Sequence, residues 1–148
     1  MNLTVNQKIA LVLSSTATVE QLTKLANDED GFVRRWVADH PNCPISSLEK
    51  LSNDEDRYVR SYVTKHPNCP IPILEKLSND EDWYVRSYVA DHSKCPIPIL
   101  EKLANDEESY VRCCVVRNPN CPQYLKDFIK VKNFITNARK NTAYYKLY

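Results

Sequence analysis

The stretch that decides the fold is residues 51–76, LSNDEDRYVRSYVTKHPNCPIPILEK, which is followed directly by a near copy of itself. Residues 77–102 read LSNDEDWYVRSYVADHSKCPIPILEK and are identical to it at 21 of 26 positions. Two weaker copies begin one period earlier, at Leu25, and one period later, at Leu103. Self-similarity at such a period predicts a solenoid, because each unit buries its apolar face only by stacking on its neighbours.

The chain, residues 1–148, is expected to form a single solenoid domain. Residues 25–128 hold four repeats, and residues 1–24 are expected to form an N-terminal cap. Residues 129–148 are expected to form a closing helix and a basic tail, because the repeat motif has ended. Residues 126–148 carry six Lys or Arg against one Asp, whereas the part before them carries 14 against 18 acidic residues. The repeats are therefore mildly acidic and the tail is basic.

Each repeat carries its own helix start and stop signals. In residues 51–76, Asp54 is expected to cap a long helix, and Pro67 ends that helix near His66, because a residue before proline avoids the α region. Pro70 suits the first turn of a second, much shorter helix, either α or 3₁₀. No segment alternates in the manner of a strand. The sequence therefore predicts an all-α fold with one long and one short helix per repeat.

The long helix of residues 51–76 is predicted to be amphipathic. The residues expected on the face that packs in the stack are Tyr58, Val59, Tyr62 and Val63. The residues expected on the solvent face are Arg57, Arg60, Ser61 and Thr64. Trp36 aligns with Tyr62 and is therefore expected to belong to the core.

The repeat motif resembles that of a known family. Its pattern is L-A/S-N-D-x-D/E-x-F/Y-V-R, then a valine, then H/N-P-N-C-P, then L-x-x-L, and it is plainest in residues 115–122, VVRNPNCP. This pattern is similar to that of the leucine-rich repeat variant family over about residues 18–125. The resemblance implies α and 3₁₀ helices wound into a right-handed superhelix without a β-sheet. Some members carry an iron–sulfur cluster on N-terminal cysteines, but the first cysteine here is Cys43, so no cofactor is expected.

Composition argues against several classes of function. A single glycine, Gly31, leaves no phosphate-binding loop and no dinucleotide fingerprint. The apolar run IALVL near the N-terminus is too short for a signal peptide, and no stretch approaches a membrane span. Six cysteines without a secretory signal are typical of reduced thiols, so a cytoplasmic protein is expected. The sequence shows no convergent nucleophile and base, so we expect no enzymatic activity.

Cysteine and histidine recur at the repeat period, in two rows. They do not predict a metal site, because equivalent positions in stacked helices lie about 8 to 10 Å apart, whereas zinc ligands lie about 2.0 to 2.3 Å from one ion. We expect the cysteines to be small buried residues that cap the short helices and the histidines to cap the long ones. The rows are Cys43, Cys69, Cys95 and Cys121, and His40, His66 and His92.

A third row, the arginine ladder, consists of Arg34, Arg60, Arg86 and Arg112. In one interpretation these guanidinium groups track a phosphate backbone or an acidic partner. In the other, each pairs with an acidic loop residue, such as Asp54 or Asp80, in its own or a neighbouring repeat. The second interpretation is favoured, because acidic residues among the arginines would repel nucleic acid.

Positions that vary between repeats favour a binding function. One helix position holds Gly31, Arg57, Trp83 and Ser109 in turn, and another holds Arg35, Ser61, Ser87 and Cys113. Both positions are expected in solvent, where aromatic and arginine side chains together are typical of binding hot spots. The alternative, in which Trp83 simply lies over its neighbours, stays open.

The sequence therefore predicts a non-enzymatic module that binds another protein through the solvent face of the long helices. The expected contact residues are Trp83, Arg57, Arg60, Arg86, Arg35, Ser61 and Ser87. The alternative function is nucleic-acid binding through the arginine ladder and the basic C-terminal tail, with its steep dependence on salt. Neither alternative involves a membrane or a metal ion.

Overall fold

A computed structural model of the protein describes residues 3–145, with side chains for residues 3–136. This part of the chain contains ten α-helices and no strand. The nine-residue long helices are α1 (Val5–Leu13), α3 (Gly31–Asp39), α5 (Arg57–Lys65), α7 (Trp83–Asp91) and α9 (Ser109–Arg117). The seven-residue short helices are α2 (Val19–Leu25), α4 (Ile45–Leu51), α6 (Ile71–Leu77) and α8 (Ile97–Leu103). The last helix is α10 (Gln123–Tyr145).

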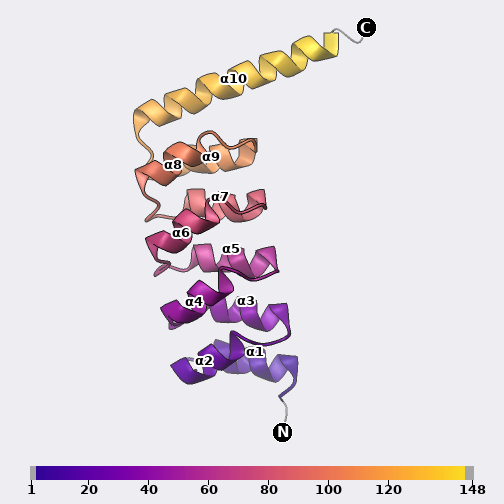
Figure 1. The fold of residues 1–148 in the computed structure, drawn as a ribbon, viewed down its shortest axis with the longest axis vertical. Coiled ribbons are helices and arrows are strands. Elements are labelled where there is room, and N and C mark those ends of the chain that lie inside the picture. Colours follow the sequence, from indigo (N-terminus) through magenta and orange to yellow (C-terminus); the bar gives the residue numbers. More distant parts are fainter. Residues whose placement is uncertain (1–2, 146–148) are drawn as a thin grey trace.

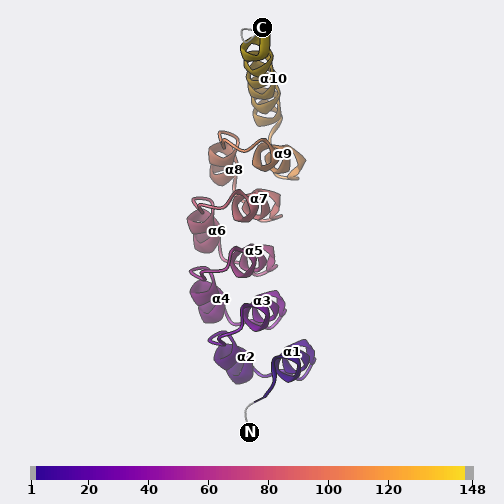
Figure 2. The same cartoon turned by 90° about the vertical axis from the view of Figure 1, so that its right-hand side faces the viewer.

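The long and short helices form two rows, which Figure 2 shows side by side. Each long helix packs on the next long helix, and each short helix contacts the long helices before and after it (Figure 1). The predicted all-α helical-repeat solenoid is therefore confirmed. Residues 1–24 were expected to form a cap, and their described part contributes a further helix pair, because α1 packs on α3 as α3 packs on α5.

The long helices begin two residues later than predicted. Asp56, not Asp54, is the N-cap of α5, and its carboxylate accepts a hydrogen bond from the N–H of Tyr58 at 2.8 Å. Asp54 instead accepts the N–H of Asp56 at 2.9 Å, inside the loop. The C-terminal end is as predicted, because α5 stops at Lys65 and His66 is its C-cap. Aspartate and proline together therefore limit the helix to nine residues.

The short helices α4, α6 and α8 have a proline and not a cysteine as their N-cap residue. Pro70 is the N-cap of α6 and Pro72 lies in its first turn. Cys69 is buried as predicted, but its thiol lies 3.9 Å from the carbonyl oxygen of Pro70, so the expectation that it caps the helix is wrong. Burial raises the pKa of the Cys43, Cys69 and Cys95 thiols to about 12. These side chains therefore serve as packing residues and stay protonated.

The buried face of the long helices is wider than predicted. In α5, Val59 and Val63 are fully buried as expected, but so are Ser61 and Thr64, which were expected in solvent. Tyr58, which was expected in the stack, is exposed. The reason is that α5 has long helices on two sides and short helices on a third. Only a narrow stripe of such a helix faces solvent.

The histidine row links successive layers of the stack. The Nδ1 atom of His66 accepts the N–H of Asn68 at 3.1 Å, so the ring proton lies on Nε2, which donates to the carbonyl oxygen of His40 at 3.1 Å. His92 donates in the same way to His66, at 3.3 Å. Asn118 takes the next place and donates to the carbonyl oxygen of His92 at 3.0 Å. These side chains therefore bond the preceding layer, and burial lowers the pKa of His92 so that its ring stays neutral.

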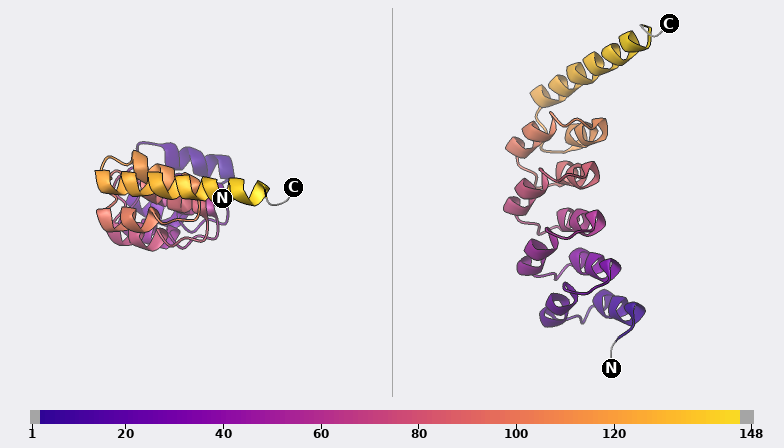
Figure 3. Two further views of the ribbon diagram at one scale, coloured as in Figure 1. Left: turned by 90° about the horizontal axis from the view of Figure 1, so that it is seen from above. Right: turned by 45° about the vertical axis from the view of Figure 1, so that its right-hand side comes forward.

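The closing helix, α10, runs through the position at which each earlier repeat breaks into a loop. Lys132 and Phe134 stand where the earlier repeats have the loop aspartate and the N-cap acid, so no residue there starts a new helix. One helix that begins at Gln123 therefore crosses the end of the stack (Figure 3). Residues 146–148 of the predicted tail lie outside the described residues.

Candidate functional site

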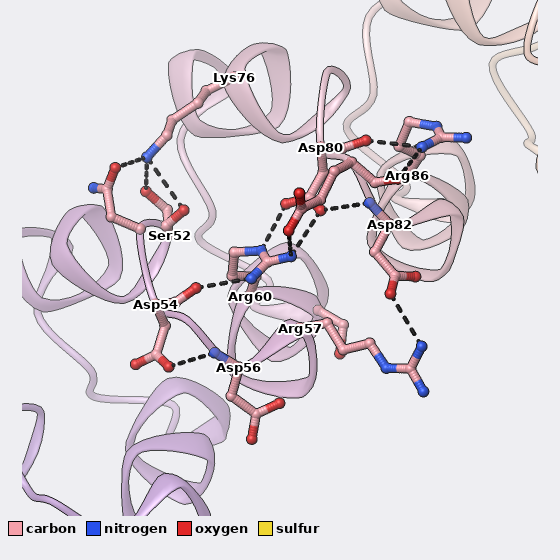
Figure 4. Close-up of polar contacts among 12 residues, drawn as sticks. Ser52, Asp54, Asp56, Arg57, Arg60, Lys76, Asp80, Asp82 and Arg86 are labelled. Atoms are coloured by element: carbon pink, nitrogen blue, oxygen red, sulfur yellow. Dashed lines mark hydrogen bonds and ion pairs between the residues drawn. The ribbon is translucent and has the colours of Figure 1, made fainter.

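Three of the four ladder arginines are neutralised by a carboxylate from the following repeat, as Figure 4 shows for Arg60 and Asp80. Arg60 donates from Nε and Nη2 to the two carboxylate oxygens of Asp80, at 2.7 and 2.9 Å. Its Nη1 donates to the carbonyl oxygens of Asp54 and Glu55 in its own repeat, at 2.8 and 3.1 Å. The hydrogen bonds with Asp80 raise the pKa of Arg60. This two-pronged contact joins consecutive loops, as the structural interpretation of the ladder predicted.

The same pairing recurs along the stack and even precedes the first arginine. The other pairs are Lys8 with Asp28 at 2.7 Å, Arg34 with Asp54 at 2.6 Å, and Arg86 with Asp106 at 2.6 Å. At the C-terminal end, Arg112 forms no ion pair with any described residue, and its Nε donates to Asn133 Oδ1 at 2.9 Å. Because most of the ladder is already paired, it does not offer a row of free guanidinium groups to a phosphate backbone.

Four of the seven predicted contact residues are buried. Arg60 and Arg86 are only 8% and 9% exposed and belong to the ladder. Ser61 and Ser87 are also buried, and their hydroxyls donate to backbone carbonyls three residues earlier in their own helices, at 2.8 and 2.7 Å. The prediction that these four residues lie on the solvent face is wrong, because the packing of long helix on long helix covers them.

Trp83 and Arg57 lie at the surface, as predicted. Trp83 is 40% exposed at the start of α7, and its ring meets that of Tyr110 edge-on, with centroids 5.6 Å apart. Arg57 donates to Asp82 Oδ2 at 3.0 Å and lies over the ring of Tyr58, 4.9 Å from its centroid (Figure 4). Both side chains are thus exposed and at the same time held by a neighbouring layer.

Trp83 belongs to a larger set of aromatic side chains, and sequence reasoning did not recognise this set as one surface. From α3 onward, the second residue of every long helix is aromatic. Three of these four residues are exposed, with values of 61% for Phe32, 41% for Tyr58 and 50% for Tyr110. We define the aromatic surface as Phe32, Trp36, Tyr58, Tyr62, Trp83, Tyr84, Tyr88 and Tyr110. A signal was present in the sequence, because each repeat has an aromatic residue directly before its buried valine.

Cationic side chains alternate with the rings of the aromatic surface. The guanidinium of Arg35, another predicted contact residue, lies 5.2 Å from the centroids of both Phe32 and Tyr62. Its Nε is buried and has no hydrogen-bond partner among the described residues. The Nζ of Lys65 lies 4.6 Å from the rings of both Tyr62 and Tyr88. Cation–π contacts of this kind, each contributing about 0.5 to 1 kcal/mol at exposed sites, hold the rings in place before any partner arrives.

A comparison with solved structures matches one described as "a leucine-rich repeat variant with a novel repetitive protein structural motif". The two sequences are 23% identical, the TM-score is 0.48, and the match covers 84% of this chain and 74% of that chain. The protein is similar to a leucine-rich repeat variant. The description of that structure names the same kind of repeat that the motif of this chain resembles. No protein-family model and no curated protein matches the sequence.

Two further findings concern the part of the chain that the structure describes. Within it, no three His, Cys, Asp or Glu side chains lie close enough together to hold a metal ion. Its helices include none that is both long enough and apolar enough to cross a membrane. What the repeat scaffold presents instead is a repeated outer surface, of which the aromatic surface is the most distinctive part.

Proposed function

We propose that the protein is a non-enzymatic scaffold that binds another protein through the aromatic surface. The observation that carries this proposal is that four successive long helices each place an exposed aromatic side chain on the outside of the stack. Such rings supply large contact areas at low cost in side-chain entropy, and they are enriched with arginine at the energetic centres of interfaces. The contacts with Arg35, Arg57 and Lys65 further reduce the ordering cost, because these side chains are already held.

A protein partner suits this surface better than a nucleic acid. The loop before each of three long helices carries a glutamate whose side chain is almost fully exposed, namely Glu55, Glu81 and Glu107. These carboxylates repel a phosphate backbone, and the ladder arginines beside them are already paired. The nucleic-acid alternative is therefore left with the basic C-terminal region alone.

Trp83 is the residue to test first, with Ile71→Ala as the matched control. Ile71 is also exposed and apolar, but it lies on the short-helix row. Proteins that co-purify with the tagged chain from its own cells would be quantified for the wild type and for both variants. We expect Trp83→Ala to lose a partner that Ile71→Ala retains, with affinity for the purified partner reduced by at least about 2 kcal/mol.

The same variants separate binding from folding. Because Trp83 is 40% exposed, its truncation should lower the free energy of unfolding by less than about 1 kcal/mol. The proposal fails if both variants retain the same partners, or if Trp83→Ala destabilises the fold by about 3 kcal/mol or more, which is the cost of a core residue.

A further inference from the structure

The end of the stack contains a groove that is larger than the one between α5 and α7. It lies between α9 and α10 and has a volume of about 520 Å³. Its apolar lining includes Cys113, Val116 and Ile129, and its charged lining residues are Arg117, Lys126 and Lys130.

The groove exists because no further long helix covers α9. Ser61 and Ser87 occupy the position of Cys113 in α5 and α7, and both are buried by the packing of neighbouring long helices. Cys113 is exposed, and Val116 is only partly buried, whereas Thr64 at its equivalent position in α5 is fully buried. After α9, the chain crosses the end of the stack as the single helix α10 (Figures 2 and 3). One side of α9 therefore keeps the apolar character of a helix-packing face without a long helix to cover it.

The charge of this groove has one sign. Arg117, Lys126 and Lys130 are cationic, and none of the described residues that line the groove is acidic. Arg117 is 3.6 Å from Asp91, but both side chains are more than half exposed, so solvent screens this pair. By contrast, the smaller groove between α5 and α7, of about 330 Å³, is lined by both Lys65 and Asp91.

We propose that the groove binds an amphipathic helix of a partner protein that carries acidic side chains beside its apolar face. The apolar face would lie against Cys113 and Val116, where a further long helix would otherwise pack. The acidic side chains would lie near Arg117, Lys126 and Lys130, which gives the complementary charge. A fatty acid fits less well, because the groove is open to solvent and half of these six lining residues are charged. None of the rings of the aromatic surface is required.

A synthetic helix provides the probe. A fluorescein-labelled peptide of about 16 residues, with alanine and leucine on one face and glutamate beside it, would be titrated with the intact chain. We expect saturable binding that weakens with added salt, and no binding of a matched peptide with lysine in place of glutamate. The double variant Lys126→Glu/Lys130→Glu should weaken binding by about tenfold or more. Lys50→Glu, on α4 at a distance along the stack, should change it by less than about twofold.

The thiol of Cys113 reports where the peptide binds. It is exposed, whereas the buried thiols with raised pKa values react slowly, so its modification by a disulfide reagent is distinguishable. The bound peptide should protect Cys113, and Phe32→Ala, on α3 at the other end of the stack, should leave peptide binding unchanged, which separates this site from the aromatic surface.

Four results would each overturn the proposal. They are an unchanged rate of Cys113 modification with the peptide bound, equal binding of the lysine peptide, displacement of the peptide by oleate at equimolar concentration, and a dimer of the chain alone in which Cys113 is already protected. The third would indicate a lipid site, and the fourth would indicate that a second copy of the chain occupies the groove.

Discussion

Two rungs of the arginine ladder show how the stack is held together and how it ends. Nε and Nη2 of Arg60 donate hydrogen bonds to the two carboxylate oxygens of Asp80 in the next repeat. At Arg112, Lys132 stands at the equivalent position, and Nε donates to Asn133 instead. Both arginine residues are buried, at 8% and 4% exposure, and both donate from Nη1 to two carbonyl oxygens of their own loop. Each arginine is thus positioned by its own repeat, whereas its neutralising charge belongs to the following one.

We call a rung closed when the ladder arginine pairs with an aspartate of the following repeat, and open when it does not. The most destabilising change should be the removal of the carboxylate from a closed rung. Asp80→Ala leaves the buried Arg60 charge without its partner, which costs about 3 to 5 kcal/mol of unfolding free energy. Urea unfolding followed by circular dichroism would measure it. Glu81→Ala is the matched control, because this side chain is 92% exposed and 3.9 Å from the same arginine, and it should cost less than about 0.5 kcal/mol. Equal effects of the two variants would mean that the closed rungs do not hold the layers.

A smaller loss is expected in the histidine row, which contains the same contrast between central and final layers. His66→Ala removes two hydrogen bonds and should cost about 2 kcal/mol. His66→Asn should cost less than about 1 kcal/mol, because Asn118 makes the corresponding bonds in the last layer. Thermal unfolding of both variants would test this, and an asparagine variant as unstable as the alanine one would show that the two layers are not equivalent.

One substitution could give Arg112 the carboxylate partner that the other ladder arginines have. Lys132→Asp restores the residue found at this position in the earlier repeats, and we expect it to stabilise the fold by about 1 kcal/mol through its pair with Arg112. Lys130→Asp makes the same charge change two residues away on α10 and should stay within about 0.5 kcal/mol of the wild type. If the two variants are equally stable, the aspartate does not reach the guanidinium.

The smallest expected effect is a difference in pH sensitivity between histidine and asparagine layers. Burial lowers the pKa of His92 from its ordinary value of 6.5, so below that pH the unfolded chain binds a proton that the folded chain does not. Stability should therefore fall between about pH 7.5 and pH 5.5. In His92→Asn, the melting temperature should fall less steeply over the same pH range. A slope identical to that of the wild type would rule out His92 as a source of the sensitivity.

The fold could be predicted because its signals are local and repeated. Pro67 ends a helix, and Asp54 lies within two residues of the true N-cap, whatever the rest of the chain does. The error at Asp54 has a physical cause, since two aspartates in one loop can each accept a backbone N–H, and only the structure shows which one starts the helix. The packing role of the cysteine row followed from the same local reasoning, but its capping role did not survive.

The surface was harder to predict because burial depends on neighbours one period away. Ser61 and Arg60 are polar and were assigned to solvent, yet adjacent repeats cover both of them. Tyr58 was assigned to the stack because the helical period places it on the same face as Val59 and Val63, although it faces outward beside Arg57. The exposure of Trp83 was predicted correctly, but the second variable position holds Ser61 and Ser87, which are buried, so variation between repeats does not by itself identify the outside of the stack.

The pairing of each ladder arginine with the following repeat has a consequence for how the number of repeats can change in evolution. Every closed rung spans one repeat boundary, and the residues on its two sides are the same at each boundary. A duplication or deletion of one whole 26-residue segment would therefore leave the arginine–aspartate pairs at the repeat boundaries intact while lengthening or shortening the outer row by one ring. The outer surface of such a chain can therefore become longer or shorter without new residues being needed for the arginine–aspartate pairs between repeats.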